Sequence, residues 1–284
     1  MQHKVQQWQD WVGRSTTLNE TLYAAPINGL IATLDRDLPA AQNGDEIPPG
    51  GHWLYFLEHT RQRDLDVDGH AIRGGFLPPV DLPRRMWAGG KLTFLKPLHI
   101  GERVTKQSAI QSVTFKDGHS GSLVFVTVEH QLTGVDGLAL IEQHDIVYRS
   151  NQSTLPVAAS KPLIKAPWMR SLAADEVMLM RYSALTFNGH RIHYDKDFAM
   201  SHDGYPGLVV HGPLMATLLM DLCTRHHPEN PLSRFDFRAR SALFASEPFH
   251  VLGTLSSDRK SADLTIQKQD GTLVMTAQAE FNES

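Results

Sequence analysis

Two neighbouring stretches of the chain, residues 182–195 and 204–213, gather side chains that can carry acid–base chemistry. Imidazole is the side chain whose ordinary pKa lies near neutrality, so we expect His193 to act as a general base. We expect the amide of Asn188 to orient a water molecule or a substrate carbonyl group. The two residues are five positions apart, which fits neither a helix face nor a strand face, and predicts a loop. The alternative interpretation is a surface turn whose polar groups bind only the local backbone.

Gly212 follows His211 and precedes Pro213 and the apolar segment 214–222. Proline is favoured at the first position of a helix, so this pattern predicts a helix start. The N–H of Gly212 would then lie at the positive end of the helix, where it can bind an oxyanion that forms during a reaction. The alternative is that glycine only lets the helix pack closely on a sheet.

Arginines form two further candidate binding groups. Arg84 and Arg85 stand beside Trp87, and two such guanidinium groups could hold a carboxylate or a phosphate. The competing interpretation is a solvated loop with a packed tryptophan. Arg238 and Arg240 alternate with apolar residues along a predicted strand, so they share one face, which is either solvated or meets the phosphates of a nucleotide-bearing substrate.

His190, His193, His211 and Asp195 superficially resemble a metal-ligand cluster. A helical zinc signature needs two histidines four residues apart with an intervening glutamate, and structural zinc sites use cysteine pairs. The sequence has neither pattern. We therefore expect no metal and no other cofactor.

The chain repeats one order of elements, a helical region followed by an antiparallel meander. Residues 1–37 predict two helices, and strand-like runs separated by turns follow at 91–95, 105–115, 122–130 and 139–148. The second copy has an apolar helix at 208–223 and strand-like runs at 235–244, 249–255, 261–267 and 272–281. The Ser- and Pro-rich segment 150–162 predicts a linker. We expect an α+β protein of two units, 1–152 and 153–284, each a central helix wrapped by a curled antiparallel sheet.

Composition excludes several classes of function. The 284 residues are 41% hydrophobic, which supplies a full core, and the net charge of −4 without a basic run argues against nucleic acid as a partner. The single cysteine, Cys223, suits a reducing compartment. No run reaches the roughly 20 apolar residues that span a bilayer, and residues 1–8 lack the apolar block of a signal peptide. We expect a cytoplasmic protein without a membrane partner.

The second half resembles the MaoC-like, (R)-specific enoyl-thioester hydratases of the hotdog fold. Their motif has an aspartate, a histidine five residues later, an acidic residue two further on, and a later His-Gly pair that starts the central helix. Asn188, His193, Asp195 and His211-Gly212 stand at those places. The departure is Asn188, because an amide cannot donate or accept a proton as a carboxylic acid does.

The whole chain, including residues 81–90 and 187–195, is similar to a narrower branch of that superfamily. This branch holds mesaconyl-C4-CoA (3-methylfumaryl-CoA) hydratases and itaconyl-CoA hydratases, with mitochondrial 3-hydroxyacyl-thioester dehydratases as relatives. The resemblance implies a double hotdog whose first half has lost the motif, and addition of water to a short branched dicarboxylic enoyl-CoA to give citramalyl-CoA. It also implies a catalytic set of Asn188, His193 and Gly212.

The same resemblance suggests which residues contact the substrate. Arg191, Arg84 or Arg85 would hold its distal carboxylate, Arg238 and Arg240 the CoA phosphates, and the further expected contacts are Tyr194, His211 and Trp87. A CoA thioester is the expected partner, and we expect a homodimer or a higher homo-oligomer. Three alternatives stay open at this point: a dehydratase of broader chain-length range, a hotdog thioesterase, and a module that binds acyl-CoA without turnover.

Overall fold

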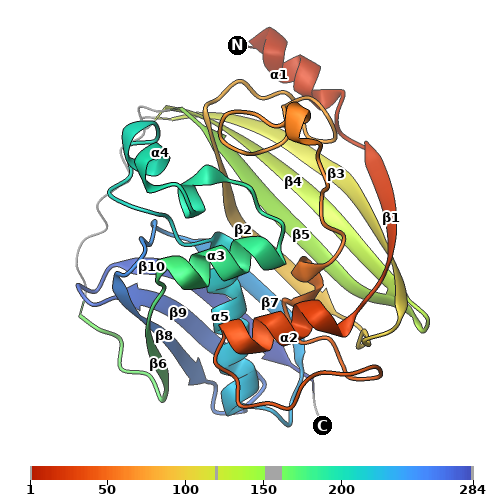
Figure 1. Ribbon diagram of the computed structural model, residues 1–284, viewed down its shortest axis with the longest axis vertical. Helices are drawn as coiled ribbons and strands as arrows, with labels where there is room; N and C mark the ends of the chain where they lie inside the picture. The colour runs from red at the N-terminus through yellow and green to blue at the C-terminus, as the bar shows by residue number, and fades with distance from the viewer. Residues whose placement is uncertain (1, 119–120, 151–161, 283–284) are drawn as a thin grey trace.

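The computed structural model describes residues 2–118, 121–150 and 162–282, in which ten strands form one antiparallel sheet in the order β1-β3-β4-β5-β2-β7-β10-β9-β8-β6 (Figure 1). In chain order the strands are β1 (Ser15–Thr21), β2 (Arg84–Phe94), β3 (Arg103–Gly118), β4 (Gly121–Gly134), β5 (Gly137–Arg149), β6 (Trp168–Ala173), β7 (Leu232–Ala239), β8 (Pro248–Leu255), β9 (Ser261–Lys268) and β10 (Leu273–Phe281). The two meanders therefore occupy opposite halves of one sheet, as the repeated pattern of the sequence predicts.

The halves of the sheet join where β2 pairs with β7, with Gly89 opposite Arg238 and Gly90 opposite Phe237. A Cβ atom on Gly89 would lie 2.5 Å from the carbonyl oxygen of Phe237, and one on Gly90 would lie 2.8 Å from that of Gln143. Glycine is needed here because the neighbouring backbones approach so closely. The loop interpretation of residues 84–90 is therefore wrong: these residues form the first part of β2 and build the junction.

The helices are α1 (Gln2–Gln9), α2 (Ala24–Thr33), α3 (Glu176–Leu185), α4 (Lys196–Ser201) and α5 (Gly212–His226), with short 3-10 helices η1 (Gly51–Leu54), η2 (Gln62–Asp64) and η3 (Arg191–His193). Ten consecutive residues of α5, 214–223, are buried, and this helix contacts all the strands from β6 to β10. Figure 1 shows α2 and α3 side by side across the sheet. The central helix is thus long in the second half, whereas the longest described helix of the first half that packs into the core is the 10-residue α2.

Several elements differ from the sequence-based expectation, among them the helices α3 and α4, which were not predicted, and the strand expected at 235–244, which ends at Ala239. The strands β1 and β6 were not predicted, and both are edge strands that pair with a single neighbour. The helix expected from residue 208 begins at Gly212, because Val209 and Val210 lie in an extended segment whose Val209 forms a β-bridge to Phe244. No helix in the described part of the chain is long and apolar enough to cross a membrane. The predicted boundary at 152 falls in 151–161, outside the described residues, and stays a prediction.

Candidate active site

A cavity of about 490 Å³ lies where the two halves of the chain meet. The part of the chain before residue 150 contributes polar side chains that include Asp68, His70, Arg84 and Arg85, together with Trp87. The later part contributes Asn188, His190, His193 and Gly212. The structure thus brings all three predicted catalytic residues to one cavity, although half of its wall comes from the part of the chain without the motif.

A rigid turn after α3 positions Asn188. The helix ends at Leu185 with Thr186 as its C-cap, and Phe187 adopts a left-handed conformation with φ of 49°. The Oδ1 atom of Asn188 then accepts a hydrogen bond of 2.9 Å from the backbone N–H of His190. This local bond fixes the oxygen end of the amide and leaves the NH₂ end to orient a ligand. The predicted loop between Asn188 and His193 is confirmed.

His193 is held so that one ring nitrogen is free to act as a base. Its Nδ1 atom lies 2.7 Å from the carbonyl oxygen of Val209. Because a carbonyl oxygen can only accept, Nδ1 carries the hydrogen, and Nε2 keeps its lone pair. Burial lowers the pKa of His193 to about 4, against a smaller opposing effect of the Val209 bond. The ring is therefore neutral at pH 7 and able to take up a proton.

The ring of His211 packs against the ring of His193. The two rings are stacked, with their centroids 3.7 Å apart. His211 is fully buried, and its Nε2 atom lies 2.8 Å from the Ser183 hydroxyl. It does not line the cavity, and its stacking on the His193 ring fits a positioning residue; direct contact of His211 with substrate stays a prediction.

Gly212 begins α5 and faces the cavity. A Cβ atom at this position would meet only the Cβ atom and carbonyl oxygen of Trp87, at 3.9 and 4.0 Å, which are ordinary contacts. Close packing of helix on sheet therefore does not require glycine here. Space for a ligand at the positive end of the helix stays the predicted reason for glycine at this position.

Of the predicted arginines, Arg84 and Arg85 line the cavity with Trp87. Arg84 donates a hydrogen bond of 2.6 Å to the carbonyl oxygen of Asp203 and lies over the ring of Tyr205. Burial is the main cause of the lowered pKa values of His70 and His190. The positive charge of Arg85, which lies nearby, lowers both pKa values further. Trp87 packs its ring 4.1 Å from that of His144.

The other predicted substrate contacts do not line the cavity. Arg191 gives two hydrogen bonds, of 2.7 and 3.1 Å, to Asp195 and is committed to that ion pair. Tyr194 is 52% exposed and bonds to the carbonyl oxygen of Gly189. Arg238 and Arg240 are both exposed; Arg238 lies on the face of β7 opposite the cavity-lining Ala239, because side chains alternate along a strand, and Arg240 follows the end of β7. Contact of these four residues with the substrate therefore stays a prediction.

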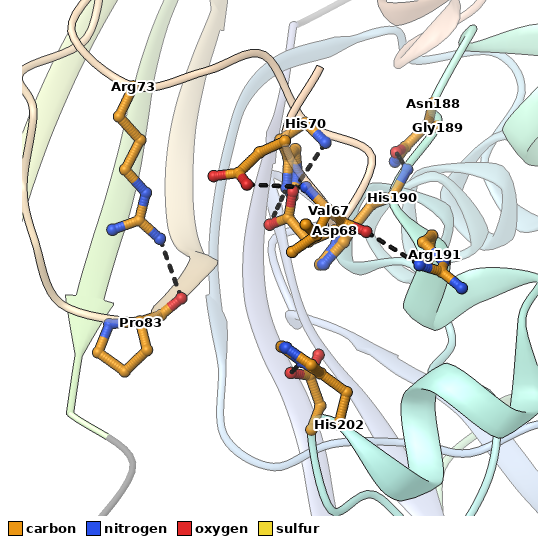
Figure 2. A network of polar contacts seen from close by, with 12 residues as sticks. Val67, Asp68, His70, Arg73, Pro83, Asn188, Gly189, His190, Arg191 and His202 are labelled. Atoms are coloured by element: carbon orange, nitrogen blue, oxygen red, sulfur yellow. Dashed lines mark hydrogen bonds and ion pairs between the residues drawn. The ribbon is translucent and has the colours of Figure 1, made fainter.

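Asp68 and His70 were not predicted from the sequence; they lie on the loop between η2 and β2. The His70 Nδ1 atom lies 2.9 Å from Asp68 Oδ2, and the His70 ring lies 4.0 Å from that of His190 (Figure 2). The local signal, an aspartate two residues before a histidine in a Gly-containing turn, is weak. Nothing in the sequence links this turn to the motif some 120 positions later.

Asp68, His70 and His190 also have donor atoms within 4.8 Å of one another, as a metal site requires. Both carboxylate oxygens of Asp68, however, already accept hydrogen bonds from His70, one from its ring and one from its backbone N–H. The donor set is thus satisfied internally, which favours an acid–base pair. The expectation of no metal stays a prediction.

Comparison with known proteins identifies the class. The family model of hydroxyacyl-thioester dehydratase type 2 matches residues 50–245. The mesaconyl-C(4)-CoA hydratase of Chloroflexus aurantiacus is 42% identical over 278 residues, which cover 96% of this chain and 98% of that protein. The mitochondrial hydroxyacyl-thioester dehydratase type 2 of Schizosaccharomyces pombe is 29% identical over 283 residues, which cover 87% of this chain and 94% of that protein.

Solved structures share the fold. A MaoC-like dehydratase from Phytophthora capsici aligns with a TM-score of 0.71 at 14% identity, covering 96% of each chain. The HtdX protein of Mycobacterium tuberculosis aligns with a TM-score of 0.66 at 15% identity, covering 95% of this chain and all of that one. The predicted α+β double hotdog of the MaoC-like class is therefore confirmed.

Fold and site together define a MaoC-like hydro-lyase, an enzyme that adds water to an enoyl thioester or removes it from a hydroxyacyl thioester. Within that class, the chain belongs to the hydroxyacyl-thioester dehydratase type 2 family.

Proposed function

We propose that this enzyme hydrates a short branched enoyl-CoA that carries a second carboxylate, mesaconyl-C4-CoA or itaconyl-CoA, to give citramalyl-CoA. The observation that carries this proposal is the presence of Arg85 in the same cavity as His193. A guanidinium group in a cavity gives a bidentate partner for a carboxylate. The 42% identity to a mesaconyl-C(4)-CoA hydratase supports the same substrate class.

The proposed reaction assigns one task to each predicted catalytic residue. A water molecule is oriented by the Asn188 amide, and Nε2 of His193 takes its proton while the water oxygen bonds to the β-carbon. In mesaconyl-C4-CoA, whose double bond is conjugated with the thioester, the electrons of that bond move to the thioester, and the N–H of Gly212 stabilises the enolate oxygen. Protonation of the α-carbon completes the product, and elimination follows the same steps in reverse.

Outside the cavity, Arg238 on β7 and Arg240 directly after it keep a proposed role with the CoA phosphates. A cytoplasmic location and a homo-oligomeric state likewise stay predictions. A broader chain-length dehydratase, a thioesterase and a non-catalytic binding module are the rival functions.

A substrate panel tests the proposal directly. The purified chain is offered mesaconyl-C4-CoA, itaconyl-CoA, crotonyl-CoA and longer 2-enoyl-CoA esters, and kcat/KM is measured for each. We expect the two carboxylated substrates to exceed crotonyl-CoA by about tenfold or more, because one buried charge-assisted pair contributes at least that much. Preference for long, uncharged chains would instead identify the broader dehydratase.

Asn188 is expected to position the water without transferring a proton. Asn188→Ala removes both the amide and the acceptor for the His190 N–H, so we expect kcat to fall by about tenfold or more through lost orientation. Asn188→Asp keeps the acceptor and should retain measurable activity, with an altered pH dependence. An alanine variant with wild-type kcat would remove Asn188 from the mechanism.

The Gly212→Ala variant tests whether glycine at this position leaves space for a ligand or serves the packing of the protein. The added Cβ atom meets Trp87 only at ordinary contact distance, so the melting temperature should stay close to that of the wild type. The methyl group enters the cavity wall at the helix start, and we expect kcat/KM to fall by about tenfold, in the range of a weakened oxyanion contact. Unchanged kinetics with a lowered melting temperature would show that Gly212 serves packing.

A further inference from the structure

Asp68 and His70 form a carboxylate–imidazole pair in the wall of the catalytic cavity that the roles above do not use. Both oxygens of Asp68 hold His70: Oδ2 lies 2.9 Å from Nδ1, and Oδ1 accepts the backbone N–H at 2.9 Å. Because an ionised carboxylate only accepts, Nδ1 carries a hydrogen. The other ring nitrogen, Nε2, is left for the contents of the cavity, which both residues line.

The loop that carries this pair is fixed against the catalytic turn. The backbone N–H of Arg191 donates to the carbonyl oxygen of Asp68 at 2.9 Å, and its Nη1 atom donates to that of Val67 at 3.1 Å (Figure 2). Gly69 has φ of 88°, and a Cβ atom there would lie only 1.9 Å from the carbonyl oxygen of Gly189. These backbone contacts set the place of His70 relative to the residues of the motif.

Three imidazoles follow one another along this wall. The ring centroids of His70 and His190 are 4.0 Å apart, and those of His190 and His193 are 5.3 Å apart. Their partners differ: His70 has a carboxylate, His193 has a backbone carbonyl, and the described residues offer the His190 side chain no hydrogen bond. A carboxylate stabilises an imidazolium ion more than a carbonyl does, so a proton shared among these rings favours His70.

We propose that His70, held by Asp68, is a second catalytic acid–base residue, which donates the α-carbon proton that Asn188 cannot supply. This inference rests on the proposed role of His193 as the base. In hydration, His193 takes one proton from water and the water oxygen bonds to the β-carbon. The electron pair of the double bond forms a C–H bond at the α-carbon with the proton from Nε2 of His70. The proton then returns from His193 to His70, with His190 lying between them.

The charges around His70 give the sign of its pH dependence. Burial lowers the pKa of His70, the Asp68 carboxylate opposes this, and Arg85 and Arg73 add to the lowering, while His190 stands beside it. A bound substrate carboxylate would favour the imidazolium form. The acid must be protonated, so activity is lost as pH rises through the pKa of His70. Without the Asp68 carboxylate that loss should begin at a lower pH.

The test measures kcat and KM between pH 5.5 and 9 for the wild type, His70→Gln and Asp68→Asn, in about half-unit steps. The substrate is the one that the wild type hydrates fastest, so a wrong assignment of the dicarboxylic substrate leaves this test intact. We expect His70→Gln to lower kcat by about a hundredfold, with KM changed by less than about threefold, and to abolish the loss of activity at high pH. Asp68→Asn should lower kcat by about tenfold and move that loss to lower pH.

His250→Gln on β8 is the matched control, since His250 pairs with Ser171 outside the cavity. Melting temperatures report folding, and the shift of the pH profile in Asp68→Asn reports a proton-transfer role that a merely structural pair would not show. A His70→Gln variant with kcat near that of the wild type would overturn the proposal. So would an unshifted profile in Asp68→Asn, or activity that is lost on removal of metal ions by EDTA, which would make the pair a metal site.

Discussion

Replacing His193 by alanine is expected to lower kcat by about a hundredfold or more, the usual contribution of a general base. The ring presents an unprotonated Nε2 to the cavity because Nδ1 donates to the carbonyl oxygen of Val209 and burial lowers the pKa of His193 to about 4. No other imidazole that lines the cavity has a backbone carbonyl fixing its tautomer among the described residues. The measurement is the initial rate of hydration at saturating substrate, at pH 7.

The control for this variant is His250→Ala, which removes an imidazole outside the cavity. His193 also stacks on the buried His211, so melting temperatures are compared to separate lost chemistry from lost packing. A folded His193→Ala enzyme with kcat within about threefold of the wild type would remove His193 as the base.

Replacing Arg85 by methionine is expected to lower kcat/KM far more for carboxylated substrates than for uncharged ones. Truncating one partner of a buried, hydrogen-bonded charge pair costs about 2 to 5 kcal/mol, which corresponds to a loss in kcat/KM of about 30-fold to several thousandfold. We expect that loss for mesaconyl-C4-CoA or itaconyl-CoA. Crotonyl-CoA has no second carboxylate, so its kcat/KM should change by less than about threefold.

Arg191→Met is the matched control because Arg191 pairs with Asp195 and does not line the cavity. Its effects should be similar on both kinds of substrate. Arg84→Met tests the neighbouring residue, whose guanidinium group already binds the carbonyl oxygen of Asp203. If Arg85→Met weakened use of both substrate kinds equally, Arg85 would serve structure or CoA binding, and the dicarboxylic assignment would lose its physical support.

Much of the fold could be predicted because local sequence and tertiary environment agree. The runs that became β3 and β4 largely alternate in burial, and Asp-Gly turns separate β3, β4 and β5, so much of the register follows from side-chain alternation and turn position. The edge strand β1 is polar and mostly exposed, and it carries little of that signal. The middle of β2 contains Gly89 and Gly90, which usually indicate a turn, and only the close approach of the neighbouring strands β5 and β7 makes them strand residues.

Only some residues of the candidate site could likewise be predicted from the sequence. Asn188, His193 and Gly212 could be found because one motif holds them within 25 positions. For Arg191, sequence spacing could not show where the side chain points, and Asp195 four residues later binds its guanidinium group. Asp68 and His70 could not be linked to the motif, because the contact between Gly69 and Gly189 that joins them is a tertiary one.

The central claim, hydration of a carboxylated enoyl-CoA, is tested most directly by incubating the enzyme with mesaconyl-C4-CoA in water labelled with heavy oxygen. The products are then separated and their masses measured, with His193→Ala run in parallel. We expect one labelled oxygen in the acyl part of an intact CoA thioester, at a rate that the variant reduces by about a hundredfold or more. Label in a free acid together with released CoA would identify a thioesterase, and unchanged mesaconyl-C4-CoA would contradict the proposed function.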